Sequence, residues 1–211
     1  MIAIVLLSLL AMTTPAEGRV DRRPPIDECA ADPSFAAFRD ELNNAVARRD
    51  RDFILSAIAD DIVTSFGGDG GRAEFVDTWA LDAPAESLIW AELSALLALG
   101  CADAGEGRYA APSLYRQLDD QGDASQALLA IRPGARLYAR PDAGSPVVAE
   151  LHWDVLTPRQ VAGSDDWWPV SLADGREGFV RRGDVRGLLD YRAIFAKVDG
   201  RWRIAVLVVG D

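Results

Sequence analysis

The chain has 211 residues, 49% of them hydrophobic, and a formal net charge of −11. This length has room for one large or two small domains, and the hydrophobic share is sufficient for a packed core and too high for a disordered chain. The acidic balance argues against nucleic acid and anionic membrane surfaces as partners, because both are bound through a basic footprint.

An uncharged apolar run opens the chain over residues 1–12. The run is too short to span a bilayer, which takes about 20 apolar residues. Ala16-Glu17-Gly18 follows with small residues at both ends, as at a signal-peptide cleavage site. We therefore predict a signal peptide over residues 1–18, a periplasmic or secreted protein, and no membrane association of the mature form. An uncleaved anchor or a misplaced start codon is the alternative, since no Lys or Arg precedes the run.

The chain has two cysteines, Cys29 and Cys101. In an exported chain an even number of cysteines favours a disulfide. This one would close a long loop and contribute roughly 4 kcal/mol in the loop-entropy model. Two buried free thiols are the alternative. Two cysteines and a single histidine lack the clustered spacing of a zinc site, so no metal is predicted.

Residues 19–31 are polar and contain Pro24-Pro25, which predicts an extended, mobile start to the mature chain. A helix is predicted from Pro33 with Asp32 as its cap, because a proline at the first helical position loses no hydrogen bond. An apolar stripe follows at helical spacing. Its members are Phe35, Phe38, Leu42 and Val46.

Three further helices are predicted before residue 100. Asp50 caps the second, residues 75–79 mark the third, and residues 87–99 form the fourth, with Leu88 among its inward-facing residues. Gly100 ends the fourth helix.

A β-branched segment over residues 62–66 predicts a strand, and the glycine-rich run 67–71 follows it as a connecting loop. A phosphate-binding loop is the alternative, but the Lys-Ser/Thr pair of a P-loop does not follow. No cofactor is therefore predicted. Residues 102–127 carry only scattered apolar residues and end in a polar linker.

The stretch 165–180 predicts two short strands joined by a turn. Asp174-Gly175 supplies the positive φ angles that a tight hairpin needs. Gly178 lies inside the second strand, where a missing side chain indicates a bulge or a close approach of another backbone.

Further strand segments flank this hairpin in a fixed order. They are Arg136-Leu137-Tyr138-Ala139-Arg140-Pro141, Ser145-Pro146-Val147-Val148-Ala149-Glu150-Leu151, Asp154-Val155-Leu156 and Gly183-Asp184-Val185. Together with Trp167-x-x-Val170 and Asp-Gly-Arg-x-Gly-Phe-Val they resemble a bacterial Src-homology-3 (SH3) type domain over residues 129–187. The resemblance implies a small, strongly bent β-barrel of a kind often exported and attached to cell-wall enzymes. It implies no single ligand.

Residues 191–209 predict another hairpin, with its turn at Asp199-Gly200. A two-residue turn sets the register of the opposing pairs. These pairs are Val198 with Arg201, Lys197 with Trp202, and Phe195 with Ile204. One face is then apolar and must be covered, because an isolated hairpin is marginal in water. It carries Tyr191, Ala193, Phe195, Trp202, Ile204, Val206 and Val208.

The opening helices, the glycine-rich loop and the closing Asp-Gly-Arg-Trp-Arg-Ile hairpin resemble the cone-shaped α+β family of nuclear transport factor 2 and its bacterial relatives. We predict an α+β fold in which this hairpin packs on the helical part. The predicted divisions are the signal peptide (1–18), an extended mature N-terminus (19–31), a mainly helical domain (32–126), an SH3-like barrel (127–189) and the closing hairpin (190–211).

The sequence contains no recognisable catalytic motif. His152, the single histidine, lies at a predicted strand end and is interpreted as a polar turn residue rather than a general base or a metal ligand. No nucleophile motif surrounds Ser145 or Ser164, and paired carboxylates such as Asp165-Asp166 lie in polar turns. Barrel-bearing cell-wall peptidases of the cysteine type need a Cys and a His in one site, whereas both cysteines here lie outside the predicted barrel and are expected to be bridged. We predict no enzyme activity and no catalytic residue.

Aromatic residues of the predicted barrel are better candidates for a binding site. They are Tyr138, Trp153, Trp167, Trp168 and Phe179. Neighbours in a regular strand point to opposite faces, so Trp167 and Trp168 cannot both join one core. The second tryptophan is then either an exposed binding anchor or covered by the helical domain or the closing hairpin.

These observations favour an exported, non-enzymatic binding or scaffolding protein of the bacterial cell envelope. Its SH3-like module would engage peptidoglycan or a protein partner. The alternative is a small-ligand or degenerate enzyme pocket in the helical part.

Overall fold

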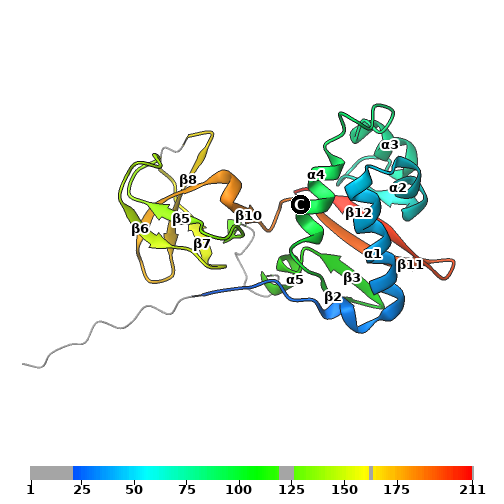
Figure 1. The fold of residues 1–211 in the computed structure, drawn as a ribbon, viewed down its shortest axis with the longest axis horizontal. Helices are drawn as coiled ribbons and strands as arrows, with labels where there is room; N and C mark the ends of the chain where they lie inside the picture. The colour runs from blue at the N-terminus through cyan, green and yellow to red at the C-terminus, as the bar shows by residue number, and fades with distance from the viewer. Residues whose placement is uncertain (1–20, 119–125, 162–163, 211) are drawn as a thin grey trace, which may run out of the picture.

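The computed structural model describes residues 21–118, 126–161 and 164–210 (Figure 1). The predicted signal peptide, residues 1–18, lies outside these ranges. The helices and 3-10 turns are η1 (Glu28–Ala31), α1 (Pro33–Arg48), α2 (Arg51–Ala57), α3 (Gly71–Thr78), α4 (Ile89–Leu97), α5 (Leu114–Leu118) and η3 (Arg182–Asp184). The strands are β1 (Ile58–Val63), β2 (Ala102–Gly105), β3 (Arg108–Ala111), β4 (Leu128–Ala130), β5 (Arg136–Tyr138), β6 (Val147–Glu150), β7 (Val155–Pro158), β8 (Trp167–Leu172), β9 (Glu177–Arg181), β10 (Val185–Gly187), β11 (Arg192–Val198) and β12 (Arg201–Val208).

The strands form two sheets in an α+β arrangement. A five-stranded sheet has the order β1-β12-β11-β3-β2, and a seven-stranded sheet has the order β10-β4-β7-β8-β9-β5-β6. We call the five-stranded sheet with α1 to α5 the first unit and the seven-stranded sheet the second unit; Figure 1 shows them at opposite ends of the long axis. The second unit lies in sequence between β3 and β11, so the helices and strands on either side of it in the sequence together build the first unit.

The opening helices begin where their caps predict. Asp32 Oδ1 accepts hydrogen bonds from the backbone N–H of Ser34 at 2.8 Å and of Phe35 at 3.1 Å, and α1 starts at Pro33. The Ser34 hydroxyl also donates to this carboxylate and, with these N–H groups, holds the pKa of Asp32 below its ordinary value. Asp50 caps α2 in the same way through Phe53 N–H at 3.0 Å. Both caps use short side chains that can satisfy the unpaired N–H groups of a first turn.

Aromatic rings form the centre of the first unit. Phe35 of α1 is fully buried, and its ring centroid lies 4.7 Å from Tyr109, 5.2 Å from Phe195 and 4.9 Å from Trp202. The apolar stripe of α1 therefore packs on the β11–β12 hairpin. This contact supplies the cover that the apolar face of the hairpin requires.

The β11–β12 hairpin has the predicted register at its turn but a bulge farther along. Asp199 and Gly200 take φ angles of 50° and 75°, and all three predicted opposing pairs are present. The register then shifts, because Phe195 pairs with Ile204 while the preceding residue of β11 pairs with Val206. The extra residue changes which side chains face the core. The prediction that Val206 and Val208 share the face of Ala193 is therefore wrong. Val206 pairs with Ile194 and is partly exposed, Val208 pairs with Arg192, and the buried Leu207 lies opposite Ala193.

The boundaries around β1 differ from the prediction. The strand runs over Ile58–Val63 rather than 62–66, and Ile58 pairs in parallel with Ile204 of β12. In the sequence, Phe53, Ile54, Ala57 and Ile58 lie at helical spacing after Asp50, but at Ile58 pairing with a strand from the other end of the chain overrides this pattern. Leu88 precedes α4 and is 76% exposed, so the prediction that it faces inward is also wrong.

The least readable part of the sequence contains a hairpin that we did not predict. β2 and β3 pair antiparallel, and β3 then pairs with β11. Tyr109 of β3 lies opposite Phe195 in this register. The segment therefore belongs to the first sheet and connects the helices to the closing hairpin.

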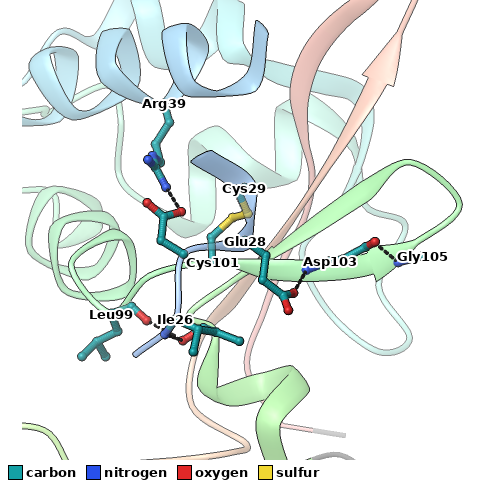
Figure 2. The surroundings of a disulfide bond; sticks show 10 residues. Ile26, Glu28, Cys29, Arg39, Leu99, Cys101, Asp103 and Gly105 are labelled. Carbon is teal, nitrogen blue, oxygen red and sulfur yellow. Dashed lines mark hydrogen bonds and ion pairs between the residues drawn. A yellow bond between two sulfur atoms is a disulfide. The ribbon is translucent and has the colours of Figure 1, made fainter. Parts of the chain in front are cut away.

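A disulfide joins Cys29 of η1 to Cys101 just before β2, and Figure 2 shows this region. The two Cα atoms are 5.8 Å apart, as in ordinary disulfides. Gly100 beside them has a φ of 72°, and a Cβ there would lie 2.1 Å from the Ile26 carbonyl oxygen. Only glycine fits this close approach. Asp27, on the same segment, is paired with Arg39 of α1 at 2.5 Å.

The second unit is built around the β8–β9 hairpin. Gly175 takes a φ of 86° in its turn, and Gly178 lies where a Cβ would be 2.5 Å from the Tyr138 carbonyl oxygen. The predicted close approach at Gly178 is therefore confirmed. Small aliphatic residues form the core. They are Leu128, Ala130, Ala135, Leu137, Ala149, Leu151, Leu156, Val170, Leu172, Val180 and Val185. Among the described residues, the edge strands β6 and β10 do not pair, and barrel closure is not detected.

Three connections hold the units against each other. Residues 21–23 lie beside the second unit, where Arg23 N–H donates to the Trp153 carbonyl and Val155 N–H to the Asp21 carbonyl. An apolar cluster joins α5 to β4. Its buried members are Leu114, Leu118 and Leu129. Arg186 of β10 pairs with Glu92 of α4 at 2.5 Å. The predicted mobile start of the mature chain is thus hydrogen-bonded from residue 21 onward.

Candidate functional site

One face of the second sheet gathers the aromatic residues that point away from its core. Tyr138 of β5 pairs with Phe179 of β9, which in turn pairs with Pro169 of β8. Trp167 stands two residues before Pro169 and therefore shares its face. The Tyr138 and Trp167 rings meet edge to face with centroids 5.4 Å apart. We call Tyr138, Trp167, Pro169 and Phe179 the outer aromatic face.

Two arginines that follow Val180 lie over tryptophan rings. The Arg181 guanidinium carbon is 5.4 Å from the Trp167 ring centroid, and that of Arg182 is 3.9 Å from the Trp168 ring centroid. A cation above an aromatic face is attracted by the electron density of the ring. Among the described residues neither arginine forms an ion pair. Both charges are therefore available to an anionic ligand in an otherwise acidic chain.

A surface depression adjoins Trp167. Arginine, proline, carboxylate and glycine groups surround it. Its lining residues are Arg132, Pro133, Asp166, Trp167, Arg181, Arg182, Gly183 and Asp184. Backbone hydrogen bonds hold this lining, including Arg182 N–H to the Asp166 carbonyl at 2.9 Å. The depression places cationic side chains beside the outer aromatic face.

An ion pair between Arg176 and Asp174 holds the turn of the β8–β9 hairpin. The Arg176 side chain donates to Asp174 with a 2.8 Å hydrogen bond and holds the pKa of that carboxyl below its ordinary value. The same contact raises the pKa of Arg176. This pairing orients the turn and involves neither Arg181 nor Arg182.

The two neighbouring tryptophans take opposite faces. Trp168 packs against the aliphatic core of the second unit, whereas Trp167 belongs to the outer aromatic face. Trp167 is nevertheless only 8% exposed. Its neighbours Tyr138 and Arg181 come from the same sheet, rather than from the helical domain or the closing hairpin.

Trp153 lies apart from the other candidates. It packs against the apolar cluster that joins α5 to β4, and its backbone carbonyl accepts a hydrogen bond from the Arg23 N–H. Trp153 therefore contributes to the contact between the units. Of the five predicted binding residues, the structure brings together only Tyr138, Trp167 and Phe179.

The described residues contain one group with metal-ligand spacing, namely Asp27, Cys29 and Cys101. The two sulfurs are bonded to each other and Asp27 is paired with Arg39, so these groups already have partners. His152 is exposed, and its backbone N–H donates to Asp154 Oδ2 at 2.5 Å. Neither the Asp27–Cys29–Cys101 group nor the surroundings of His152 bring a nucleophile next to a general base.

Comparisons with known proteins add no assignment: no family model, no curated protein and no solved structure matches this chain. In the described ranges no helix combines the length and the apolarity that crossing a membrane requires.

Sequence reasoning missed the arginines of the site. The pair Arg181-Arg182 at the end of a strand of apolar alternation was a usable signal, because the alternation places Arg181 on the face opposite Val180. A buried arginine in the first unit, Arg192, had no such signal. Its place in β11 reads as solvent-facing, since the neighbouring Ala193 faces the core.

Proposed function

We propose that the second unit is an SH3-like binding module in an exported, non-enzymatic protein of the bacterial cell envelope. The observation that carries the proposal is the outer aromatic face with Arg181 over Trp167. Rings that lie outside the core are not needed to fill it, and aromatic and arginine side chains are the commonest anchors of recognition surfaces.

The site fits an extended ligand that combines apolar groups with carboxylates. Arg181 and Arg182 supply cationic groups beside the rings, and the adjoining depression offers room for a second part of the ligand. The peptides of peptidoglycan have this mixed character, and so do acidic segments of envelope proteins. We take peptidoglycan as the first ligand and a protein partner as the alternative.

Co-sedimentation with purified peptidoglycan tests this proposal. The wild-type chain is expected in the pellet, and Arg181→Gln and Phe179→Ala are each expected to lower retention by roughly five- to tenfold, the effect of losing one anchor. Arg48→Gln, which removes an exposed arginine of α1, is the matched control and should be retained like wild type. Absence of the wild-type chain from the pellet would exclude peptidoglycan as the ligand.

A further inference from the structure

A surface depression lies beside the paired strands β1 and β12 of the first unit. Its volume is about 480 Å³, within the range of small-molecule sites. The parallel pairing of Ile58 with Ile204 brings its walls together from α2, β1, α3 and the β11–β12 hairpin. The lining residues are Ser56, Ile58, Ala59, Asp60, Arg72, Val198, Asp199, Arg201 and Arg203. The depression therefore has room for a small organic ligand.

Two arginines of β12 line this depression without a counter-ion. Trp202 between them is buried, so the alternation of the strand directs Arg201 and Arg203 to the opposite face, with Cα atoms about 6.6 Å apart. Arg203 Nη1 donates to the Trp202 carbonyl at 3.2 Å. Among the described residues no carboxylate forms an ion pair with either guanidinium. Each therefore has N–H groups free to bind a carboxylate of a ligand.

The third cation of the lining is already neutralised. Arg72 of α3 pairs with Asp60 of β1 at 2.7 Å and also donates to the Leu55 carbonyl. This contact joins α3 to β1 and adds no net charge to the depression. Asp199, in the hairpin turn, is the lining carboxylate that forms no ion pair within the described ranges. The unpaired groups of the lining are thus two guanidiniums and one carboxylate.

We propose that this depression binds a small aliphatic amino dicarboxylate. The two carboxylates of the ligand pair with Arg201 and Arg203, and its ammonium group pairs with Asp199. The methylene groups lie against Ile58 and Val198, which give the lining its apolar part. The single net negative charge of such a ligand balances the single net positive charge of the three unpaired side chains, and matched charges of this kind favour one ligand over others. The site lies in the first unit and does not depend on the outer aromatic face.

Amide chemical shifts in nuclear magnetic resonance, followed during titration of the purified chain, test the site with L-glutamate as the probe. Saturable shifts are expected at the amides of Arg201 and Arg203, with a dissociation constant of about 1 mM. Glutarate lacks the ammonium group, and L-glutamine lacks one carboxylate. Each should bind roughly three- to fivefold more weakly than L-glutamate, the effect of losing one exposed ion pair.

Three variants assign the groups of the ligand to their partners. Arg201→Gln and Arg203→Gln should each weaken the binding of L-glutamate by roughly three- to fivefold. Asp199→Asn keeps a residue that tolerates the φ of 50° in the turn. It should weaken the binding of L-glutamate but bind glutarate at least as tightly as wild type, because it removes only the partner of the ammonium. Arg108→Gln, which removes an exposed arginine of β3 in the same sheet, is the matched control and should bind like wild type.

Any of four outcomes would overturn the proposal. They are no saturable shift at about 20 mM L-glutamate, equal binding of L-glutamate and L-glutamine, unchanged binding by both arginine variants, or the same shifts at equal concentrations of inorganic phosphate. Equal binding of L-glutamate and glutarate by wild type would contradict the role of Asp199 and with it the amino group of the ligand. If Arg203→Gln does not fold, Arg201→Gln decides, because the exposed Arg201 makes no contact within the described residues that folding could require.

Discussion

The two units of this chain use aromatic residues in opposite ways. In the first unit Phe35, Phe195 and Trp202 are buried against one another beneath the helices. In the second unit leucine, valine and alanine fill the core, and Tyr138 and Phe179 lie on the outer face. Rings that fill a core contribute mainly to stability, whereas rings outside it can contribute to recognition. The first unit therefore depends on its rings for stability, whereas the second unit carries rings on a surface where they can contact a ligand.

The largest expected effect comes from deleting residues 190–211. The deletion removes β11 and β12, which lie between β1 and β3 in the first sheet. It also exposes the α1 stripe, so the first unit should lose its cooperative thermal transition while a fragment spanning 127–189 stays folded. Circular dichroism and thermal melting measure both. A truncated protein with its full helical signal and melting temperature would show that the first unit does not depend on both chain ends.

A matched pair of ring deletions tests the contrast directly. Phe35→Ala leaves a cavity at the centre of the first unit and should lower the free energy of unfolding by about 3–5 kcal/mol. Phe179→Ala removes a partly buried ring from the outer aromatic face and should cost about 1 kcal/mol or less. Urea denaturation measures both variants. Equal losses would mean that the outer rings are structural, and would weaken their assignment to binding.

The disulfide should stabilise only the first unit. Replacing Cys29 and Cys101 by serine is expected to cost about 2–4 kcal/mol there, because the bond restricts the unfolded chain, and to leave the second unit unchanged. Thiol counting on protein denatured without reductant should detect no free thiol. Two free thiols would contradict the bond, and a wild-type chain that loses no stability in reductant would show that the bond does not stabilise the first unit.

The smallest expected effect is on the stability of the first unit at acid pH. The Glu74 carboxylate accepts hydrogen bonds from the Thr64 hydroxyl and the Gly70 N–H. These bonds, that of Thr64 above all, hold the pKa of Glu74 below the ordinary value of 4.5. Because the folded pKa is lowered, Glu74 contributes stability above pH 4.5 that is lost as the pH falls through its folded pKa. Glu74→Gln should therefore flatten the acid side of the melting-temperature profile of the first unit. An identical acid slope in wild type and variant would exclude this contribution.

Features that depend on a few neighbouring residues could be predicted from the sequence. Asp32 and Asp50 cap their helices because the interaction needs only the next three residues. The turn at Asp199-Gly200 sets the first pairs of its hairpin because two positive φ angles determine the twist of the strands. Gly178 and the opposite faces of Trp167 and Trp168 follow equally from the geometry of a single strand.

The tertiary structure alone decided the features that join distant residues. β1 begins at Ile58 because a strand from the other end of the chain pairs with it, and the bulge after Ile204 changes the buried face in a way that alternation does not encode. The candidate site of the second unit belongs to this class. Arg181 reaches Trp167 only because β8 and β9 pair, and the fold likewise brings the Arg192 guanidinium beside Phe66 and Tyr115, which are far from it in sequence. Such contacts depend on where whole elements pack, and the local pattern of a chain does not specify that.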